Sequence, residues 1–434
     1  MSTTPLTLSI AGQPTPITLP QVPGTRGHVG VDIRELNHSG FCSYDPGFAN
    51  TAGCQSAISW IDTENSVLLH RGYPVDQLAR QCDFLEVAYI MLRGDAPDEA
   101  SYQTFRETIT RHTLVHEQIA RMCSGFRRDS HPMALMCALV GALAAFYHDV
   151  LDVENPQHRA LAATRLLSKM PTIAAMSYKY TIEQPAAYPR NDLSYAGNFL
   201  QMLFAIPAEK YVLNPVIEQA MNQILVLHAD HGQCASTTTV RAAGSSGANL
   251  FACVAAGLAS LWGPMHGGAN ESSMRMLEEI ESVDQVPAFL RQAKRDPQAF
   301  RRLGFGNSRY RHRDPRADIL RETSHRVLAE VGMSDRLLQV AMALEDVALT
   351  DPYFVENGLS PSVDFYTAVI LKAMNLPSSM FAVVTAVGRT VGWVAHWNEM
   401  HQAPLTIYRP RQIYVGEEYR DYVSRRSEQP TGSR

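Results

Sequence analysis

Four short motifs, far apart in the sequence, contain residue types that can transfer protons or bind anions. They are His228–His231, Gly263–Gly268, Gly304–Arg316 and Val363–Tyr366, and three further arginines accompany them: Arg389, Arg409 and Arg411. Imidazole and carboxylate groups act as general acids and bases. Planar guanidinium groups bind carboxylates through two parallel hydrogen bonds.

Each motif taken alone also has a structural explanation. The histidines at 228, 231 and 266 could bind zinc, but no Cys or carboxylate stands at a clear ligand spacing, so no metal site is predicted. Asp364 precedes an apolar run and could be a helix N-cap. Arg409 and Arg411 flank a proline and could be solvated surface charges. The glycines beside His266 let a ligand or another backbone approach closely, which is the more suggestive feature.

Composition indicates a globular protein of two or three domains. The chain has 434 residues, of which 45% are hydrophobic and 19% charged. Its net charge of -5 argues against nucleic acid or an anionic membrane as a partner. Seven cysteines without a CxxC pair indicate free thiols, and the N-terminus resembles no signal peptide, so a cytoplasmic location is expected. The apolar stretches Met133–Tyr147 and Gly247–Trp262 fall short of the roughly 20 residues that span a bilayer. They are therefore predicted to be buried helices.

Periodicity predicts a mainly helical chain with a short hairpin at its start. Leu6–Ile17 alternates apolar and polar residues about a turn. Ser245-Ser246-Gly247 is predicted to cap the helix that follows it, and the prolines from Pro156 to Pro207 to separate helices. The predicted helices are Val75–Leu92, Ser101–Phe126, His131–Val150, His158–Tyr178, Tyr195–Phe204, Val216–His228, Ala248–Trp262, Ala317–Val331, Asp335–Leu349, Tyr366–Met374 and Met380–Trp397.

Taken together, the motifs resemble one known family. The segment His228–Asn270 reads HADHGQCASTTTVRAAGSSGANLFACVAAGLASLWGPMHGGAN and is similar to the central segment of bacterial type II citrate synthases. Four more stretches in the same order share the resemblance: FRRDSHPM at Phe126–Met133, LLSKMPT at Leu166–Thr172, YPRNDLSYAGNF at Tyr188–Phe199 and RTVGWVAHWNEM at Arg389–Met400.

The resemblance implies a two-domain helical fold with a short β-rich N-terminal segment. The N-terminal segment would be residues 1–50, the large helical domain 51–270 plus 375–434, and the small helical domain 271–374. The chain would form a homodimer, and type II members are typically hexamers built as trimers of dimers. No bound cofactor is implied, and acetyl-CoA would be a co-substrate.

The resemblance also implies an acyltransferase mechanism and assigns residues to it. Asp364 matches the base that removes a methyl proton from acetyl-CoA, and His266 matches the residue that hydrogen-bonds the thioester oxygen. The enolate would attack a 2-oxo acid, and the resulting thioester would be hydrolysed. The matching positions for the oxo acid are His231, Arg316, Arg389 and Arg409, the last reaching across the dimer, and Arg311 matches a position that meets the CoA phosphates.

The chain departs from its family at the residue that polarises the substrate ketone. The family pattern is GFGHRVYK, whereas residues 304–311 read GFGNSRYR. Asn307 can donate a hydrogen bond but is no practical proton source. Ser308 and Arg309 also change the donors and the charge around the substrate. Nearby, the family's HADHEQN has become HADHGQC over residues 228–234, which removes a carboxylate and an amide.

Three explanations of this departure stay open. The enzyme could be retuned for an oxaloacetate analogue, for which 3-phosphonopyruvate is the specific hypothesis, making it a 2-phosphonomethylmalate synthase. It could be an ordinary citrate or 2-methylcitrate synthase that tolerates the change. It could instead be a catalytically silent paralogue that binds CoA or a metabolite and regulates a partner.

The type II resemblance also implies an NADH-binding regulatory pocket. The matching positions are Arg111, His112, Tyr147, Arg165, Lys169 and Asn191. Ordinary polarity at a subunit interface is the alternative explanation of these residues.

Overall fold

The computed structural model describes residues 4–12, 15–295, 304–305, 310, 313–332 and 336–422. Its contacts divide the chain into two units. Unit 1 contains Met1–Pro23, Val29–Ala52 and Tyr408–Arg434, and unit 2 contains Gly24–His28 and Gly53–Ile407. The domain boundaries implied by the family resemblance stay a prediction.

Unit 1 contains two short antiparallel strand pairs. Strand β1 (Leu6–Leu8) pairs with β2 (Ile17–Leu19), with Leu6 opposite Leu19. Strand β3 (Gln21–Val22) pairs with β4 (Gly30–Val31). The predicted N-terminal hairpin is therefore confirmed.

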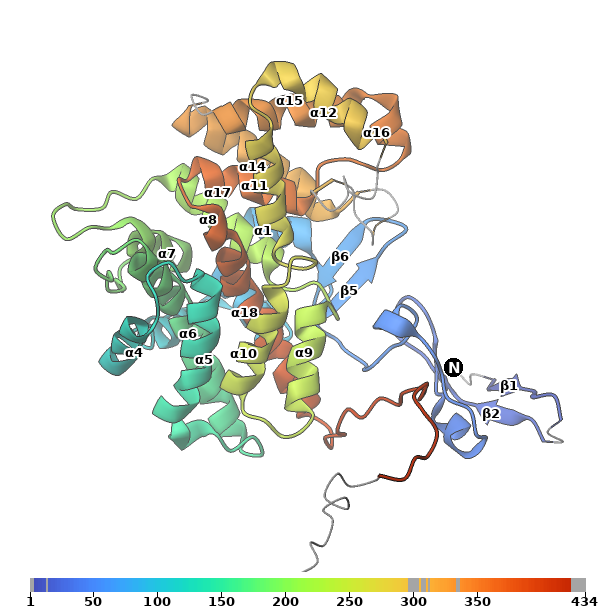
Figure 1. The fold of residues 1–434 in the computed structure, drawn as a ribbon. Helices are drawn as coiled ribbons and strands as arrows, with labels where there is room; N and C mark the ends of the chain where they lie inside the picture. The colour runs from blue at the N-terminus through green and yellow to red at the C-terminus, as the bar shows by residue number, and fades with distance from the viewer. Residues whose placement is uncertain are drawn as a thin grey trace, which may run out of the picture. The chain divides into compact units, whose positions relative to one another are not determined.

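Unit 2 is predominantly helical, as predicted, and begins with a small sheet (Figure 1). Its three antiparallel strands are β5 (Ser59–Asp62), β6 (Val67–His70) and β7 (Tyr73–Pro74). The helices that follow are α1 (Val75–Gln81), α2 (Phe84–Arg93), α3 (Glu99–Thr110), α4 (Glu117–Met122), α5 (Pro132–Phe146), α6 (Pro156–Thr181), α7 (Tyr195–Phe204), α8 (Pro215–His228), α9 (Ala235–Gly244), α10 (Leu250–Leu261), α11 (Ala269–Glu279), α12 (Val286–Ala293), α14 (Pro315–Val331), α15 (Arg336–Thr350), α16 (Pro352–Glu356), α17 (Val363–Ala373) and α18 (Phe381–Met400).

Two predicted helices are wrong in extent because polar caps interrupt them. Val75–Leu92 divides into α1 and α2, since Asp83 accepts a hydrogen bond from the backbone N–H of Glu86 and starts a new helix. Ser101–Phe126 divides into α3 and α4, and the side chain of His116 caps the second.

Two predicted boundary signals are also wrong. Pro171 does not separate helices but lies inside α6. The Ser245–Gly247 segment does not cap α10; Asn249 does, by accepting a hydrogen bond from Ala252 N. The β5–β7 sheet and the helices α9, α11, α12 and α16 were not predicted from periodicity.

Helix α18 runs through the middle of unit 2 and organises its packing (Figure 1). It contacts α2, α6, α8, α9 and α10, and its residues from Phe381 to Trp397 are all buried. By length and composition the segment Ser378–Met400 could cross a membrane, but 89% of its apolar 18-residue window is buried inside the protein. The shorter apolar helices α5 and α10 lie where buried helices were predicted.

The close approach of α18 to the end of α8 requires glycine. A Cβ atom added to Gly392 would lie 2.3 Å from the carbonyl oxygen of Ala229 and 2.7 Å from Asp230 Oδ1. This contact fixes the turn after α8, which carries several of the motif residues, against the helix that carries Arg389.

Replacing Gly392 with Ala is expected to destabilise the protein by about 1–3 kcal/mol, because the added methyl group overpacks a backbone contact. Gly125→Ala is the matched control. A Cβ atom at this position would meet no atom within 4 Å, so a change of no more than about 0.5 kcal/mol is expected. Urea denaturation measures both. Equal stability of the Gly392→Ala and native proteins would contradict the packing described.

Candidate active site

The turn after α8 places His231 beside Tyr310. Asp230 Oδ2 accepts a hydrogen bond of 2.8 Å from the backbone N–H of Gly232, whose positive φ of 60° turns the chain. His231 Nε2 and Tyr310 Oη are 3.1 Å apart, and both side chains are buried. His231 is thus fixed by a residue that follows the altered GFGNSR motif.

A tight loop after α10 presents His266. Its backbone closes through hydrogen bonds from Gly267 N to Leu261 O (2.8 Å) and from Gly268 N to Gly263 O (3.2 Å). A Cβ at Gly267 would lie 2.7 Å from the carbonyl oxygen of Leu261, so the loop closes only with glycine there. The predicted importance of the glycines beside His266 thus has a geometric reason.

The contacts of His266 fix its tautomer. Its Nε2 accepts from the backbone N–H of Ser236 at 3.4 Å and lies 2.9 Å from Ser236 Oγ. Trp393 Nε1 donates to the same Oγ at 3.2 Å, which leaves the Ser236 hydroxyl proton for His266. With Nε2 accepting, the proton of the neutral imidazole lies on Nδ1, where it is a hydrogen-bond donor.

Asp364 lies in the first turn of α17 and is not its N-cap. Ser362 caps the helix by accepting from the backbone N–H groups of Asp364 and Phe365, so the N-cap explanation of Asp364 is wrong. The amide nitrogen of Asn270, in the orientation that satisfies its surroundings, donates to Asp364 Oδ1 and to the Asp364 carbonyl oxygen, both at 2.9 Å. Asn270 was missed in the sequence, although it directly follows the glycines of the His266 motif.

Burial raises the pKa of Asp364 to about 6. The positive charges of Arg316 and Arg389 act in the opposite direction, and Asp314 adds to the rise. The carboxyl group is therefore a base that is largely ionised at neutral pH and stronger than an ordinary Asp. The electrostatic effects also show that Arg316, His266 and Arg389 lie close to Asp364.

Two buried guanidinium groups face this region. Arg316 donates from Nε to Asp314 Oδ1 (3.0 Å) and from an Nη atom to Asp314 Oδ2 (2.7 Å), and the neighbouring carboxylates raise its pKa despite burial. Arg389 donates from Nε to the carbonyl oxygen of His228 (2.7 Å) and from an Nη atom to Cys234 Sγ (3.1 Å). These contacts use only part of the five N–H donors of each group.

The structure thus brings together five of the predicted site residues. They are His231, His266, Arg316, Asp364 and Arg389. Asn307, Ser308, Arg309 and Arg311 lie outside the described residues. Arg409 is an exposed residue of unit 1, and its predicted reach across a dimer stays a prediction. Within the described part of the chain, no three His, Cys, Asp or Glu side chains form a metal-binding group.

Four of the predicted regulatory residues also cluster. The Arg165 guanidinium lies 4.6 Å and Lys169 Nζ 5.3 Å from the ring centre of Tyr147. Lys169 Nζ also donates to the carbonyl oxygen of His112, and burial lowers the pKa of Lys169 to about 8, helped by Arg165. Arg111 pairs instead with Glu107 at 3.1 Å, and Asn191 is exposed.

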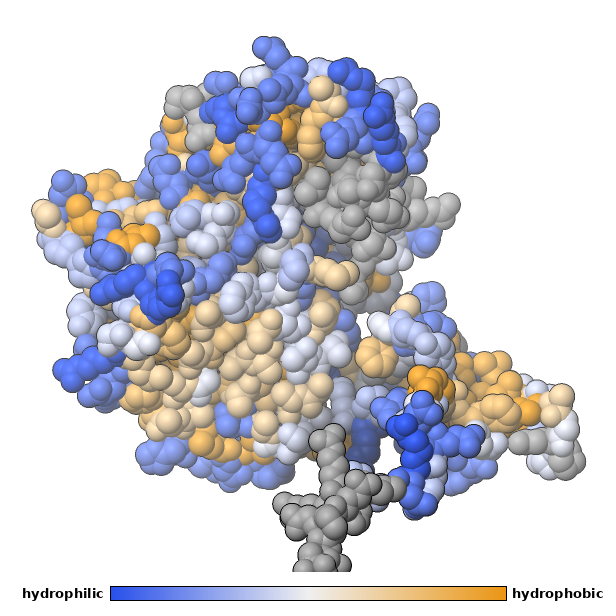
Figure 2. All heavy atoms as spheres, in the orientation of Figure 1, coloured by the Kyte–Doolittle hydropathy of each residue, from blue (hydrophilic) through white to orange (hydrophobic). Residues whose placement is uncertain are grey.

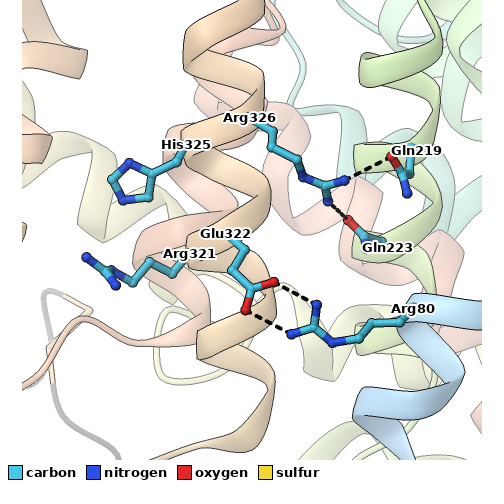
Figure 3. Close-up of a pocket in the computed structure, with 7 residues that line it drawn as sticks. All are labelled: Arg80, Gln219, Gln223, Arg321, Glu322, His325 and Arg326. Atoms are coloured by element: carbon cyan, nitrogen blue, oxygen red, sulfur yellow. Dashed lines mark hydrogen bonds and ion pairs between the residues drawn. The ribbon is translucent and has the colours of Figure 1, made fainter.

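A separate cavity of about 630 Å³ lies between α1, α8 and α14, and Figure 3 shows its lining. Arg80 forms two hydrogen bonds with Glu322, and Arg326 donates to the side-chain oxygens of Gln219 and Gln223. These arginines are already paired, so the cavity is poorly suited to bind a dianion. Its contacts instead hold α14, whose second residue is Arg316, against α8.

The raised pKa of Asp364 predicts how its replacement changes stability with pH. A carboxyl whose pKa rises from 3.8 to about 6 on folding favours the folded state most at low pH and loses that contribution as pH rises toward 6. Asp364→Asn should therefore stabilise the protein at pH 8 by up to about 3 kcal/mol, and by much less at pH 4. Urea denaturation at both pH values measures this difference. Asp318→Asn, at an exposed position of α14, is the control, and an equal effect of Asp364→Asn at both pH values would contradict the raised pKa.

Comparison with known proteins gives one consistent family. Residues 47–411 match the family model described as citrate synthase, C-terminal domain. The chain is similar to the crystal structure of citrate synthase from Pyrobaculum aerophilum, with 31% identity over 88% of this chain and 95% of that chain and a TM-score of 0.81. It is also similar to citrate synthase from Thermotoga maritima, with 28% identity over 87% of this chain and 97% of that one and a TM-score of 0.73.

A third similar structure contains ligands. It is the ternary complex of carboxymethyl coenzyme A and oxaloacetate with citrate synthase from Thermoplasma acidophilum. That protein is 26% identical over 89% of this chain and 99% of its own, with a TM-score of 0.79. The family model and the structural neighbours agree with the fold and the site geometry: this chain belongs to the citrate synthase family, whose members are acyltransferases.

Proposed function

We propose that this chain condenses acetyl-CoA with a 2-oxo acid related to oxaloacetate and then hydrolyses the thioester. The observation that carries the proposal is the position of the Asp364 carboxyl, which is close to His266 and to two buried arginines. The similar Thermoplasma acidophilum enzyme binds a coenzyme A derivative together with oxaloacetate, which supports the same pair of substrate classes here.

The first step is removal of a methyl proton from acetyl-CoA by Asp364. The methyl group is a very weak carbon acid, so the enolate oxygen must be stabilised as the proton leaves. The Nδ1–H of His266 is suited to this because Ser236 occupies Nε2. Asn270, which donates to Asp364 Oδ1, orients the carboxylate.

The second step is attack of the enolate carbon on the ketone of the oxo acid. Arg316 and Arg389 supply the positive charge for a dianion, and each retains donors beyond those used in its anchoring contacts. His231, held by Tyr310, adds a further contact to the same substrate.

The preferred oxo acid in this proposal is an oxaloacetate analogue, specifically 3-phosphonopyruvate, with 2-phosphonomethylmalate as the product. The support is the sequence GFGNSRYR, in which Asn307 replaces the proton-donating His and Ser308-Arg309, in place of the family's Arg-Val, move a cation by one position. Gly232 in place of Glu removes one negative charge near His231. A bulkier, more highly charged anion suits both changes. Citrate or 2-methylcitrate synthesis is the alternative that the substrate test below distinguishes.

We also propose a homodimer, and a hexamer as in type II members, in the cytoplasm. Figure 2 shows apolar colouring gathered over α5 and α10. Small residues lie partly or fully exposed there, among them Ala138 and Gly141 in α5 and Ala252 and Ala259 in α10. Small residues let helices of two subunits approach closely.

NADH regulation is a further proposal, supported by the cationic cluster of Arg165 and Lys169 around Tyr147.

Asp364→Ala and His266→Ala should each lower CoA release from acetyl-CoA by roughly 10²–10⁴-fold, because each removes a group that acts on the forming enolate. In the native protein kcat/KM should rise with pH through about 6 as Asp364 ionises. The assay follows free CoA with a thiol reagent. Arg121→Gln, at an exposed position of α4, is the control and should retain activity. Near-native turnover in either site variant would refute the assigned roles.

The substrate is tested by measuring CoA release with oxaloacetate, 3-phosphonopyruvate, pyruvate and 2-oxoglutarate in parallel, for the native protein and for Asn307→His. The native protein should prefer 3-phosphonopyruvate, and the variant should shift toward oxaloacetate because His restores a proton donor.

Strong turnover of oxaloacetate by the native protein would identify an ordinary citrate synthase. Unchanged selectivity in Asn307→His would show that this position does not set specificity. No turnover of any oxo acid would favour the silent, ligand-binding paralogue.

A further inference from the structure

A thiol lies against one of the two site arginines. Cys234 Sγ is 3.1 Å from an Nη atom of Arg389 and 3.3 Å from Thr237 Oγ1. The Cys234 residue is 6% exposed, so these contacts are largely shielded from water. Ser236, two residues later, hydrogen-bonds His266, so the sulfur is close to the proposed catalytic group.

The thiol is not explained by the local fold. Cys234 is the N-cap of α9, yet its side chain makes no capping hydrogen bond. The family motif has Asn at this position, and Asn is among the best N-cap residues whereas Cys is not. Compared with the family motif, the chain therefore has a weaker N-cap on α9. At the same position it has a polarisable sulfur beside the guanidinium group of Arg389.

The environment favours the thiolate form. Burial disfavours the ionised sulfur, but the charge of Arg389 and the interactions with His266 and Ser236 together outweigh it, so the pKa of Cys234 is held well below its usual range. Five other thiols differ, because burial raises the pKa of Cys54 and Cys123 and brings the pKa of Cys137 to about 11 and of Cys82 and Cys253 to about 12.

A second side chain indicates that this region accommodates a ligand. The imidazole of His228 is buried, and its Nε2 has no hydrogen-bond partner within the described residues. Burial lowers the pKa of His228 to about 3, and Arg316 and Arg389 lower it further, so the ring is neutral and close to both guanidinium groups. The uncommitted Nε2 of His228 is therefore in the same region as both arginines, one of which, Arg389, contacts the thiol.

We propose that Cys234 is a nucleophilic thiolate in the oxo-acid site and a covalent modification site for small electrophilic carboxylic acids of the 3-halo-2-oxo class. Arg389 and Arg316 attract the carboxylate of the reagent and bring its halogen-bearing carbon to the sulfur. The sulfur attacks that carbon, a C–S bond forms, the carbon–halogen bond breaks, and halide leaves with the bonding electrons. No oxidant or other reactant is required. The location of the oxo acid, though not the reactivity of the thiol, rests on the proposed function.

The test is alkylation of the native, folded protein with 3-bromopyruvate, followed by peptide mass spectrometry of every cysteine. Cys234 should be modified at least tenfold faster than any other thiol, and excess pyruvate should slow its modification because pyruvate competes for the arginines. Neutral iodoacetamide should show no comparable preference for Cys234. Arg389→Gln should reduce the rate at Cys234 at least tenfold.

Two variants complete the design. Cys234→Asn, which restores a good N-cap residue, should lose the fast modification, while Cys54→Ser should keep both the modification rate at Cys234 and the turnover of the native protein. Modification spread over the other thiols with Cys234 unmodified, or a Cys234 rate insensitive to pyruvate and to Arg389→Gln, would overturn the proposal. Because mass spectrometry reads the thiol directly, modification without any CoA release would refute only the proposed function. CoA release without modification would refute only this inference.

Discussion

Two guanidinium charges buried beside a proton-accepting carboxyl group are the constraint on which this structure depends. A buried charge is costly unless it is paired and hydrogen-bonded, and a charge that is fully paired cannot bind a substrate. The chain resolves this conflict by anchoring each arginine through only some of its donors. Arg316 is held by the Asp314 carboxylate and, at 3.4 Å, by the carbonyl oxygen of Leu227, whereas Arg389 is held by a backbone carbonyl and a thiol.

The anchoring groups are part of the helices that form the fold. Asp314 caps α14 by accepting from the backbone N–H of Arg316 and also pairs with the Arg316 side chain. One carboxylate therefore starts the helix and orients its first charged side chain. The carbonyl that holds Arg389 belongs to His228, the last residue of α8, where α18 passes closely because Gly392 has no side chain. A change in helix packing would therefore move the substrate charges directly.

The sequence predicts much of this, but not all. Apolar helices such as α7 and α18 follow from periodicity, and the motifs around His266, Asp364 and Arg389 follow from their resemblance to a family. The more polar helices α9 and α11 were missed because their buried positions include polar as well as apolar residues, which weakens the periodic pattern. The role of Asn270 and the contact between Cys234 and Arg389 could not be predicted, because they join segments that are far apart in the chain.

The same electrostatic arrangement couples the two substrates. Arg316 and Arg389 lower the pKa of Asp364, while burial raises it, so the base strength reflects a balance between them. An oxo-acid dianion bound to these arginines neutralises the charges that weaken the base, and the pKa of Asp364 must then rise. Asp364 is consequently a stronger base toward acetyl-CoA after the oxo acid has bound than before it. An enolate formed without an acceptor would only return its proton, so this order of events favours productive condensation. Before the oxo acid binds, the proposed thiolate of Cys234 neutralises part of the positive charge of Arg389. A substrate carboxylate then takes over this neutralisation.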